Sequence, residues 1–98
     1  MLGPIVRAVG DKIEVHLDGG IRSGQDVFKA LALGAKSTYI GRSYIYGLGA
    51  MGQVGVTKAL EVIQKELDIT MALTGVQKAT DIGRNNVLVP KDFEGEWR

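Results

Sequence analysis

The sequence predicts an α/β fold organised around one strand–helix–strand unit, and three observations support this. The alternation of apolar and polar residues at 12–17 has the period of two that is typical of a strand. A second β-rich run follows at 37–40. Between them lies an amphipathic segment bounded by Ser23 and Gly34, whose spacing predicts a helix. Two strands joined by a helix through short corners form a parallel βαβ unit.

The elements on either side of this unit are expected to be helical. A first helix should end before Gly10, with a proline in its first turn. The helix between the strands should begin after the N-cap residue Ser23, with Asp26 three residues later in a weak capping-box pattern. Gly75 should end the last long helical region. The expected helical ranges are 4–9, the segment after Ser23, 44–52, 53–67, 69–73 and 77–82, followed by an extended tail around Pro90.

Each strand ends in a corner whose residue types suit a bound phosphate. Paired glycines allow positive φ angles and close approach of the backbone to a ligand. The amides that open the following helix are expected to be unpaired and to point at an anion. A guanidinium adds a planar, permanently charged fork that matches phosphate oxygens. Two such corners, one helix apart, predict a single anion site made of Asp18, Gly19, Gly20, Arg22, Gly41 and Arg42.

The composition excludes several classes of function. A chain of 98 residues allows one domain at most. Its formal net charge of +1 gives no electrostatic case for binding nucleic acid or an anionic membrane. The absence of cysteine excludes disulfides and metal sites built from thiolates. It also suits a cytoplasmic chain. We expect no bound metal. No apolar run reaches the roughly 18 residues of a membrane span.

The predicted elements do not add up to a complete sheet. Parallel strands are normally covered by helices on both faces and paired along both edges. Two strands leave most of these backbone groups without partners. We therefore expect residues 1–98 to be part of a larger domain, completed by further strands or by self-association.

Three segments resemble one family of flavoenzymes. They are Asp-Gly-Gly-Ile-Arg-Ser-Gly at 18–24, the stretch at 27–35 followed by Ile-Gly-Arg at 40–42, and Glu-Leu-Asp-Ile-Thr-Met-Ala-Leu-Thr-Gly at 66–75. Together they are similar to the C-terminal quarter of the FMN-dependent α-hydroxy-acid dehydrogenases and oxidases, such as L-lactate dehydrogenase and glycolate oxidase. The glycine–arginine core alone is shared with other FMN barrels and with inosine-monophosphate dehydrogenase. The segment at 66–75 makes the resemblance more specific to the α-hydroxy-acid family. The resemblance covers about residues 2–87.

The resemblance implies a TIM (β/α)8 barrel, which needs about 250 residues. Residues 14–17 would form its strand seven, 37–40 its strand eight and 53–67 its last helix. It also implies FMN as the cofactor and a small 2-hydroxy acid, oxidised to a 2-keto acid, as the substrate of the full enzyme. By resemblance, Asp18 faces the ribityl chain of the flavin. The phosphate of the flavin is held by Gly20, Arg22, Gly41 and Arg42.

The resemblance further implies that the catalytic residues lie outside this sequence. The family takes its base from an Asn-His-Gly-Gly-Arg motif, whose arginine binds the substrate carboxylate, and this motif is absent here. We therefore expect no catalytic residue in the chain and no turnover by the 98 residues alone. Two alternatives stay open: an autonomous phosphate-binding module, and a segment of another phosphate-binding barrel such as type 2 isopentenyl-diphosphate isomerase.

Other conspicuous side chains have structural interpretations. His16 is the only histidine; it lies in a predicted strand and is expected to be packed or hydrogen-bonded. The three tyrosines Tyr39, Tyr44 and Tyr46 are expected to pack against the barrel wall. Arg22 and Arg42 have a surface alternative as well, ion pairs with Asp26 or with glutamates.

Overall fold

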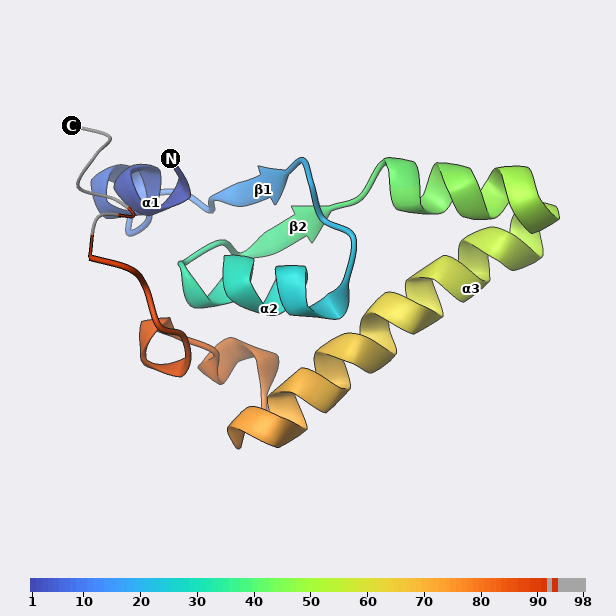
Figure 1. The fold of residues 1–98 in the computed structure, drawn as a ribbon. Helices are drawn as coiled ribbons and strands as arrows, with labels where there is room; N and C mark the ends of the chain where they lie inside the picture. The colour runs from blue at the N-terminus through green and yellow to red at the C-terminus, as the bar shows by residue number, and fades with distance from the viewer. Residues whose placement is uncertain (92, 94–98) are drawn as a thin grey trace.

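The computed structural model describes residues 1–91 and 93, and its elements follow the predicted order. Figure 1 shows a small parallel sheet with the helix that joins its two strands lying on one side of it. The C-terminal tail expected around Pro90 lies partly outside the described residues. The elements are α1 (Leu2–Val9), β1 (His16–Asp18), α2 (Gly24–Ala32), β2 (Ser37–Tyr39), α3 (Arg42–Thr74) and the 3-10 turns η1 (Ala79–Asp81) and η2 (Arg84–Asn86).

The predicted βαβ unit is present, with strands shorter than expected. β1 and β2 pair in parallel, with His16 opposite Ser37 and Asp18 opposite Tyr39. The expected strand at 12–17 begins only at His16, because the amides of residues 12 and 13 instead donate to the carbonyl of Val9, in a turn that follows α1. The second strand ends one residue before its expected end.

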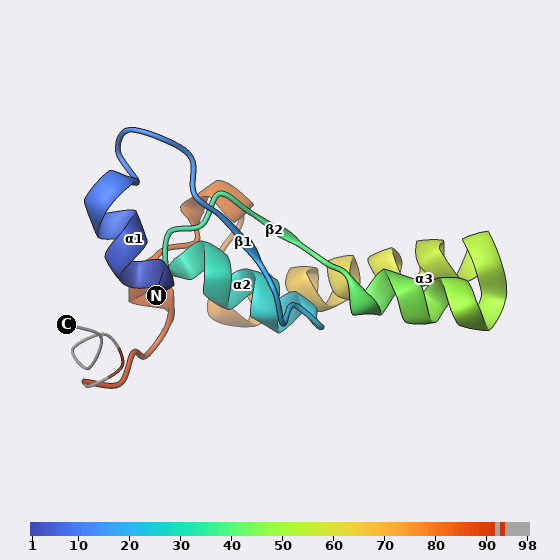
Figure 2. The same ribbon diagram turned by 90° about the horizontal axis from the view of Figure 1, so that it is seen from above.

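Helix α2 begins as its sequence predicts. The Asp26 amide donates to Ser23 Oγ at 3.2 Å, so Ser23 is the N-cap. Gly34, with a φ of 110°, follows the helix two residues after its end. A Cβ on Gly24 would overlap the backbone of α3 near Leu67, so this glycine allows the two helices to approach closely. α2 therefore lies between the sheet and α3, as Figures 1 and 2 show.

The main core lies where α2, α3 and the C-terminal turns meet. Its buried members come from α2 and from the segment after α3, which explains why η1 and η2 fold back beside these helices. Burial of this kind contributes about 25 cal/mol for each Å² of apolar surface removed from water. The core consists of Phe28, Ala32, Val76 and Ile82, with Leu31, Leu67, Met71 and Val87 packed against it.

Helix α3 differs from the prediction of separate helices at 53–67 and 69–73. The two are one continuous helix, because no glycine or proline lies between them to interrupt it. The real interruption is a bend at Met51 and Gly52, where Gly52 has a φ of 61°. Residues 42–50 thus form a short helical segment, close to the expected 44–52. Gly75 ends the helix in the left-handed conformation, as predicted.

The remaining helical predictions differ in extent. α1 begins two residues earlier than expected, at Leu2, and Gly10 follows its end as predicted. The expected helix at 77–82 is reduced to the 3-10 turn η1. A second 3-10 turn, η2, occupies Arg84–Asn86, where the extended tail was expected to begin.

One face of the sheet is open. In Figure 2 the two strands lie over α2, and no other described element covers them from the opposite side. The side chains of Glu14, His16, Asp18 and Tyr39 are exposed, whereas Val15 and Leu17 are half-buried. Many large apolar side chains of α3 are exposed as well, including Val54, Leu60, Val62, Ile69 and Leu73. Among the described residues, no helix is both long and apolar enough to cross a membrane.

Candidate functional site

The two glycine–arginine corners lie together at the carboxyl ends of β1 and β2. They line one open cavity of about 350 Å³. Parallel strands bring their carboxyl ends to the same edge of the sheet, which is why residues more than 20 positions apart meet here. The lining contains all six predicted site residues and three others: Asp18, Gly19, Gly20, Ile21, Arg22, Tyr39, Gly41, Arg42 and Ser43.

Two contacts join the corners to each other. Asp18 and Tyr39 are opposite each other in the strand register, so the last residues of the two strands are neighbours. Beyond the strands, Ser43 Oγ donates to the carbonyl oxygen of Ile21 at 3.4 Å, a long hydrogen bond that links the start of α3 to the first corner. The cavity is therefore built from adjacent parts of one βαβ unit.

The glycines of the first corner have the backbone conformation that the motif predicts. Gly19 and Gly20 have φ angles of 113° and 76°, which side chains rarely allow. A Cβ built on Gly19, Gly20 or Gly41 meets no atom of the protein within 4 Å. The space above the backbone is thus open at all three glycines, and a ligand can approach their peptide groups closely.

The expectation of unpaired amides at the start of α2 is wrong for two of the first three amides of this helix. The Gly24 amide donates to Glu66 Oε1 at 3.1 Å, and the Asp26 amide donates to Ser23 Oγ. The amide of Arg22 donates to Asp26 Oδ2 at 3.0 Å. Close packing of α3 against α2 brings Glu66 to this helix end, so two of the first three α2 amides, those of Gly24 and Asp26, are used within the protein.

The remaining donors are the two guanidinium groups and the first turn of α3. Within residues 1–91 and 93, neither the Arg22 nor the Arg42 side chain has an ion-pair or hydrogen-bond partner. The surface alternative, in which Arg22 and Arg42 form ion pairs with Asp26 or with glutamates, is not observed among the described residues. The first amides of α3 lack intrahelical partners by the geometry of a helix start. This donor set fits a phosphate group.

Tyr39 is one of the three lining residues that were not among the predicted site residues. It was expected to pack, but its side chain is 53% exposed and lines the cavity. Its hydroxyl lies 3.1 Å from Nδ1 of His16, which is hydrogen-bonded as expected. The available signal was its position two residues before Gly41 on the predicted second strand, which places it at the same sheet edge as Asp18.

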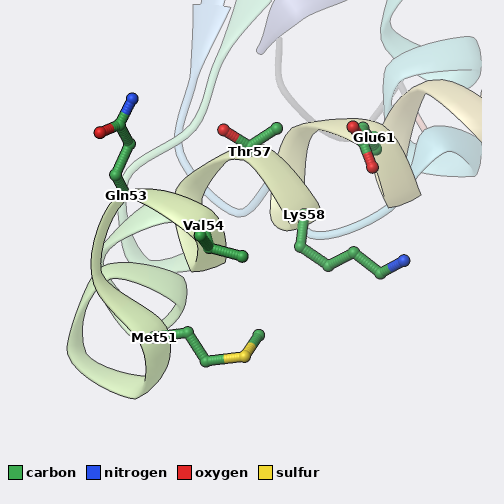
Figure 3. Close-up of a pocket in the computed structure, with 6 residues that line it drawn as sticks. All are labelled: Met51, Gln53, Val54, Thr57, Lys58 and Glu61. Carbon is green, nitrogen blue, oxygen red and sulfur yellow. The ribbon is translucent and has the colours of Figure 1, made fainter.

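A larger hollow of about 620 Å³ lies on α3, away from these corners. Figure 3 shows its lining side chains spreading outward along the helix surface. No set of them converges on a common point, so we assign no site to it. In the part of the chain that the structure describes, no group of three or more His, Cys, Asp or Glu residues could hold a metal ion. The lining residues are Met51, Gln53, Val54, Thr57, Lys58 and Glu61.

Comparison with known proteins identifies relatives of nearly the whole chain. The profile of the FMN-dependent dehydrogenase family matches residues 1–89. The peroxisomal (S)-2-hydroxyacid oxidase GLO3 of Arabidopsis thaliana is 52% identical over 87 residues, which is 89% of this chain and 24% of that protein. The L-lactate dehydrogenase of Caulobacter vibrioides is 52% identical over 81 residues, covering 83% of this chain and 21% of that protein.

Solved structures show the same likeness. A mandelate oxidase carrying a monooxide FMN adduct superimposes with a TM-score of 0.73 at 45% identity, covering 87% of this chain and 26% of that one. The chain thus spans about a quarter of the length of the curated relatives it matches.

Proposed function

The chain belongs to the family of FMN-dependent dehydrogenases, and from this we propose that it supplies the flavin phosphate site of an L-2-hydroxy-acid oxidoreductase. One observation carries the proposal. The two glycine–arginine corners line a single cavity, and the guanidinium groups of Arg22 and Arg42 have no partner among the described residues. Guanidinium groups without internal partners at a cavity rim are suited to a phosphate dianion.

The proposed place of the chain is the C-terminal quarter of a (β/α)8 barrel. β1 and β2 would be strands seven and eight, and residues 53–74 of α3 would be the last barrel helix. Phosphate sites of such barrels commonly use the loops after these two strands and a short extra helix. Residues 42–50 form a short helical segment of that kind, directly after the second corner. The open sheet face and the exposed apolar side of α3 support a larger domain around residues 1–98.

Each corner residue has a distinct role in this proposal. When bound, FMN supplies the group that accepts reducing equivalents from the α-carbon of the 2-hydroxy acid. Arg22 and Arg42 bind the phosphate, and Gly20 and Gly41 let the backbone approach it, with Gly19 completing the first turn. Asp18, a carboxylate, accepts hydrogen bonds from hydroxyls of the ribityl chain. The proton-accepting base and the substrate-binding arginine come from outside these 98 residues.

The similarity of this segment to known proteins does not distinguish an oxidase from a dehydrogenase, which differ in their electron acceptor. The segment is equally similar, at 52% identity, to an enzyme named as an oxidase and to one named as a dehydrogenase. The cytoplasmic location expected from the composition stays a prediction.

The proposal is tested by separating the phosphate from the rest of the flavin. In the purified protein that contains this chain, Arg42→Ala should weaken FMN binding by about one to two orders of magnitude, because charge-assisted contacts contribute roughly 1.5–3 kcal/mol each. Arg42→Lys should recover part of this loss, since it keeps the charge without the fork. Riboflavin, which lacks the phosphate, should bind equally to all three proteins.

A control variant removes one positive charge from a residue outside the cavity. Lys65 is an exposed residue of α3 that does not line the cavity. Lys65→Ala should leave FMN affinity unchanged. Equal weakening of FMN and riboflavin by Arg42→Ala would overturn the phosphate assignment, and a wild-type protein that binds no FMN would overturn the proposed function.

A further inference from the structure

A chain of three polar side chains runs along the open face of the sheet toward the cavity. Tyr39 Oη lies 3.1 Å from His16 Nδ1, and His16 Nε2 lies 3.3 Å from Glu14 Oε1. The two rings contact each other, with centroids 5.8 Å apart. Tyr39 is also opposite Asp18 in the strand register and lines the same cavity. His16 and Glu14 therefore hold the side chain of Tyr39, a residue that lines the candidate site and is opposite Asp18 in the strand register.

The hydrogen-bond chemistry of this chain sets the direction of the Tyr39 hydroxyl. An ionised Glu14 carboxylate only accepts, so Nε2 of His16 carries the proton that it donates. In the neutral imidazole Nδ1 then has a lone pair and accepts the Tyr39 O–H. In this tautomer of His16 the phenol proton is used inside the protein, and Tyr39 offers the lone pairs of Oη to a ligand.

The residues that line the cavity consequently form two chemically different sets, which we call its two sides. Asp18 and Tyr39, on neighbouring strands, present acceptors. Arg22 and Arg42 present donors. A ligand that fits both sides has hydroxyl groups next to a phosphate, because hydroxyls donate to the acceptors and the phosphate accepts from the guanidinium groups. A phosphate placed against Asp18 would be repelled, so the two sides also determine which way round the ligand lies.

We propose that Tyr39 is a ligand-positioning residue whose phenol oxygen, held by the contact with His16, accepts a hydrogen bond from a hydroxyl of a phosphorylated polyol chain. This inference rests on the proposed function, in which that chain is the ribityl phosphate of FMN. It adds a residue for the hydroxyl part of the ligand, beyond the phosphate contacts of Arg22 and Arg42.

The test measures binding of three probes to the purified protein that contains this chain. FMN and riboflavin are titrated by flavin fluorescence, and inorganic phosphate is measured as a competitor of FMN. Tyr39→Phe keeps the ring and removes the hydroxyl. It should weaken FMN and riboflavin by the same factor, roughly threefold to tenfold for one neutral hydrogen bond. The inhibition constant of phosphate should not change.

Matched variants show whether Tyr39 positions the ligand or only supports the fold. Tyr44→Phe removes a hydroxyl from a tyrosine that does not line the cavity, and should leave all three constants unchanged. His16→Ala should weaken FMN and riboflavin by less than Tyr39→Phe. In the double variant the loss should equal that of Tyr39→Phe alone, because His16 acts only through the Tyr39 hydroxyl.

The outcomes distinguish this inference from the function on which it rests. If the wild-type protein binds FMN but Tyr39→Phe leaves riboflavin affinity unchanged, the role of Tyr39 is overturned and the proposed function stands. Weakened phosphate competition in Tyr39→Phe would also overturn that role, because the phenol would then act on the phosphate side or on the fold. Additive losses in the double variant would overturn the role of His16.

Discussion

Gly47 and Gly55 lie backbone against backbone where the two parts of α3 turn past each other. A Cβ on Gly55 would overlap the carbonyl group of Gly47, and a Cβ on Gly47 would overlap that of Gly55. The bend at Met51 and Gly52 lies between them in the sequence. The short segment that carries Arg42 is therefore held against the long segment that packs on α2.

Gly55→Ala should consequently destabilise the protein by roughly 1–3 kcal/mol, the usual effect of forcing an atom into a closely packed contact. Gly49→Ala is the matched control, because it lies in the same helix and its Cβ would meet nothing within 4 Å. It should be neutral or stabilising by up to about 1 kcal/mol, since alanine favours helix over glycine. Urea unfolding of both variants measures the difference. Equal stability of the two would contradict the close crossing.

Gly20 and Gly41 should respond differently to alanine. Gly20 has a φ of 76°, so Gly20→Ala strains the backbone and should lower the free energy of unfolding by roughly 1–2 kcal/mol. Gly41 has a φ of −125° and open space at its Cβ, so the fold should tolerate Gly41→Ala. The added methyl group lies where we place the phosphate, and FMN affinity should fall while the melting temperature is unchanged. Unchanged FMN affinity in Gly41→Ala would argue against that placement.

The 98-residue chain alone should not oxidise 2-hydroxy acids. We propose that the residues that line the cavity bind a phosphate and hydroxyl groups, and the Asn-His-Gly-Gly-Arg motif, which by the family resemblance supplies the base, is absent from the sequence. Removing one member of a catalytic unit already lowers turnover by several orders of magnitude. The measurement is anaerobic reduction of added FMN by L-lactate, followed by flavin absorbance. Complete reduction at an enzymatic rate would contradict this prediction.

The isolated chain should also fail to behave as a compact monomer. Its buried apolar residues are few, and large apolar side chains along α3 are exposed, among them Val54 and Leu73. The two-stranded sheet also leaves its outer edges unpaired within the described residues. We expect self-association or a broad thermal transition. Sedimentation at the monomer mass together with a sharp two-state melt would show that the chain is complete by itself.

Local sequence features predicted the parts of the fold that depend on short-range backbone preferences. Ser23 caps α2 and Gly75 ends α3, because a side-chain acceptor and a left-handed glycine act on their own helix ends. The two glycine–arginine corners were predicted to form one site, and they line one cavity, because parallel strands joined by a helix must end at the same edge. The prediction of a helix break between residues 67 and 69 was wrong, because no glycine or proline lies there to interrupt the helix.

The sequence by itself therefore determined the βαβ unit, its caps and the pairing of the corners. Only the tertiary structure decided which donors of the site stay available. Glu66, 42 positions from Gly24, takes the first amide of α2, and this depends on how closely two distant helices pack. The hydrogen bond between His16 and Tyr39, two residues 23 positions apart, likewise depends on the register of the two strands. Contacts of this range follow from packing and pairing, which local preferences do not specify.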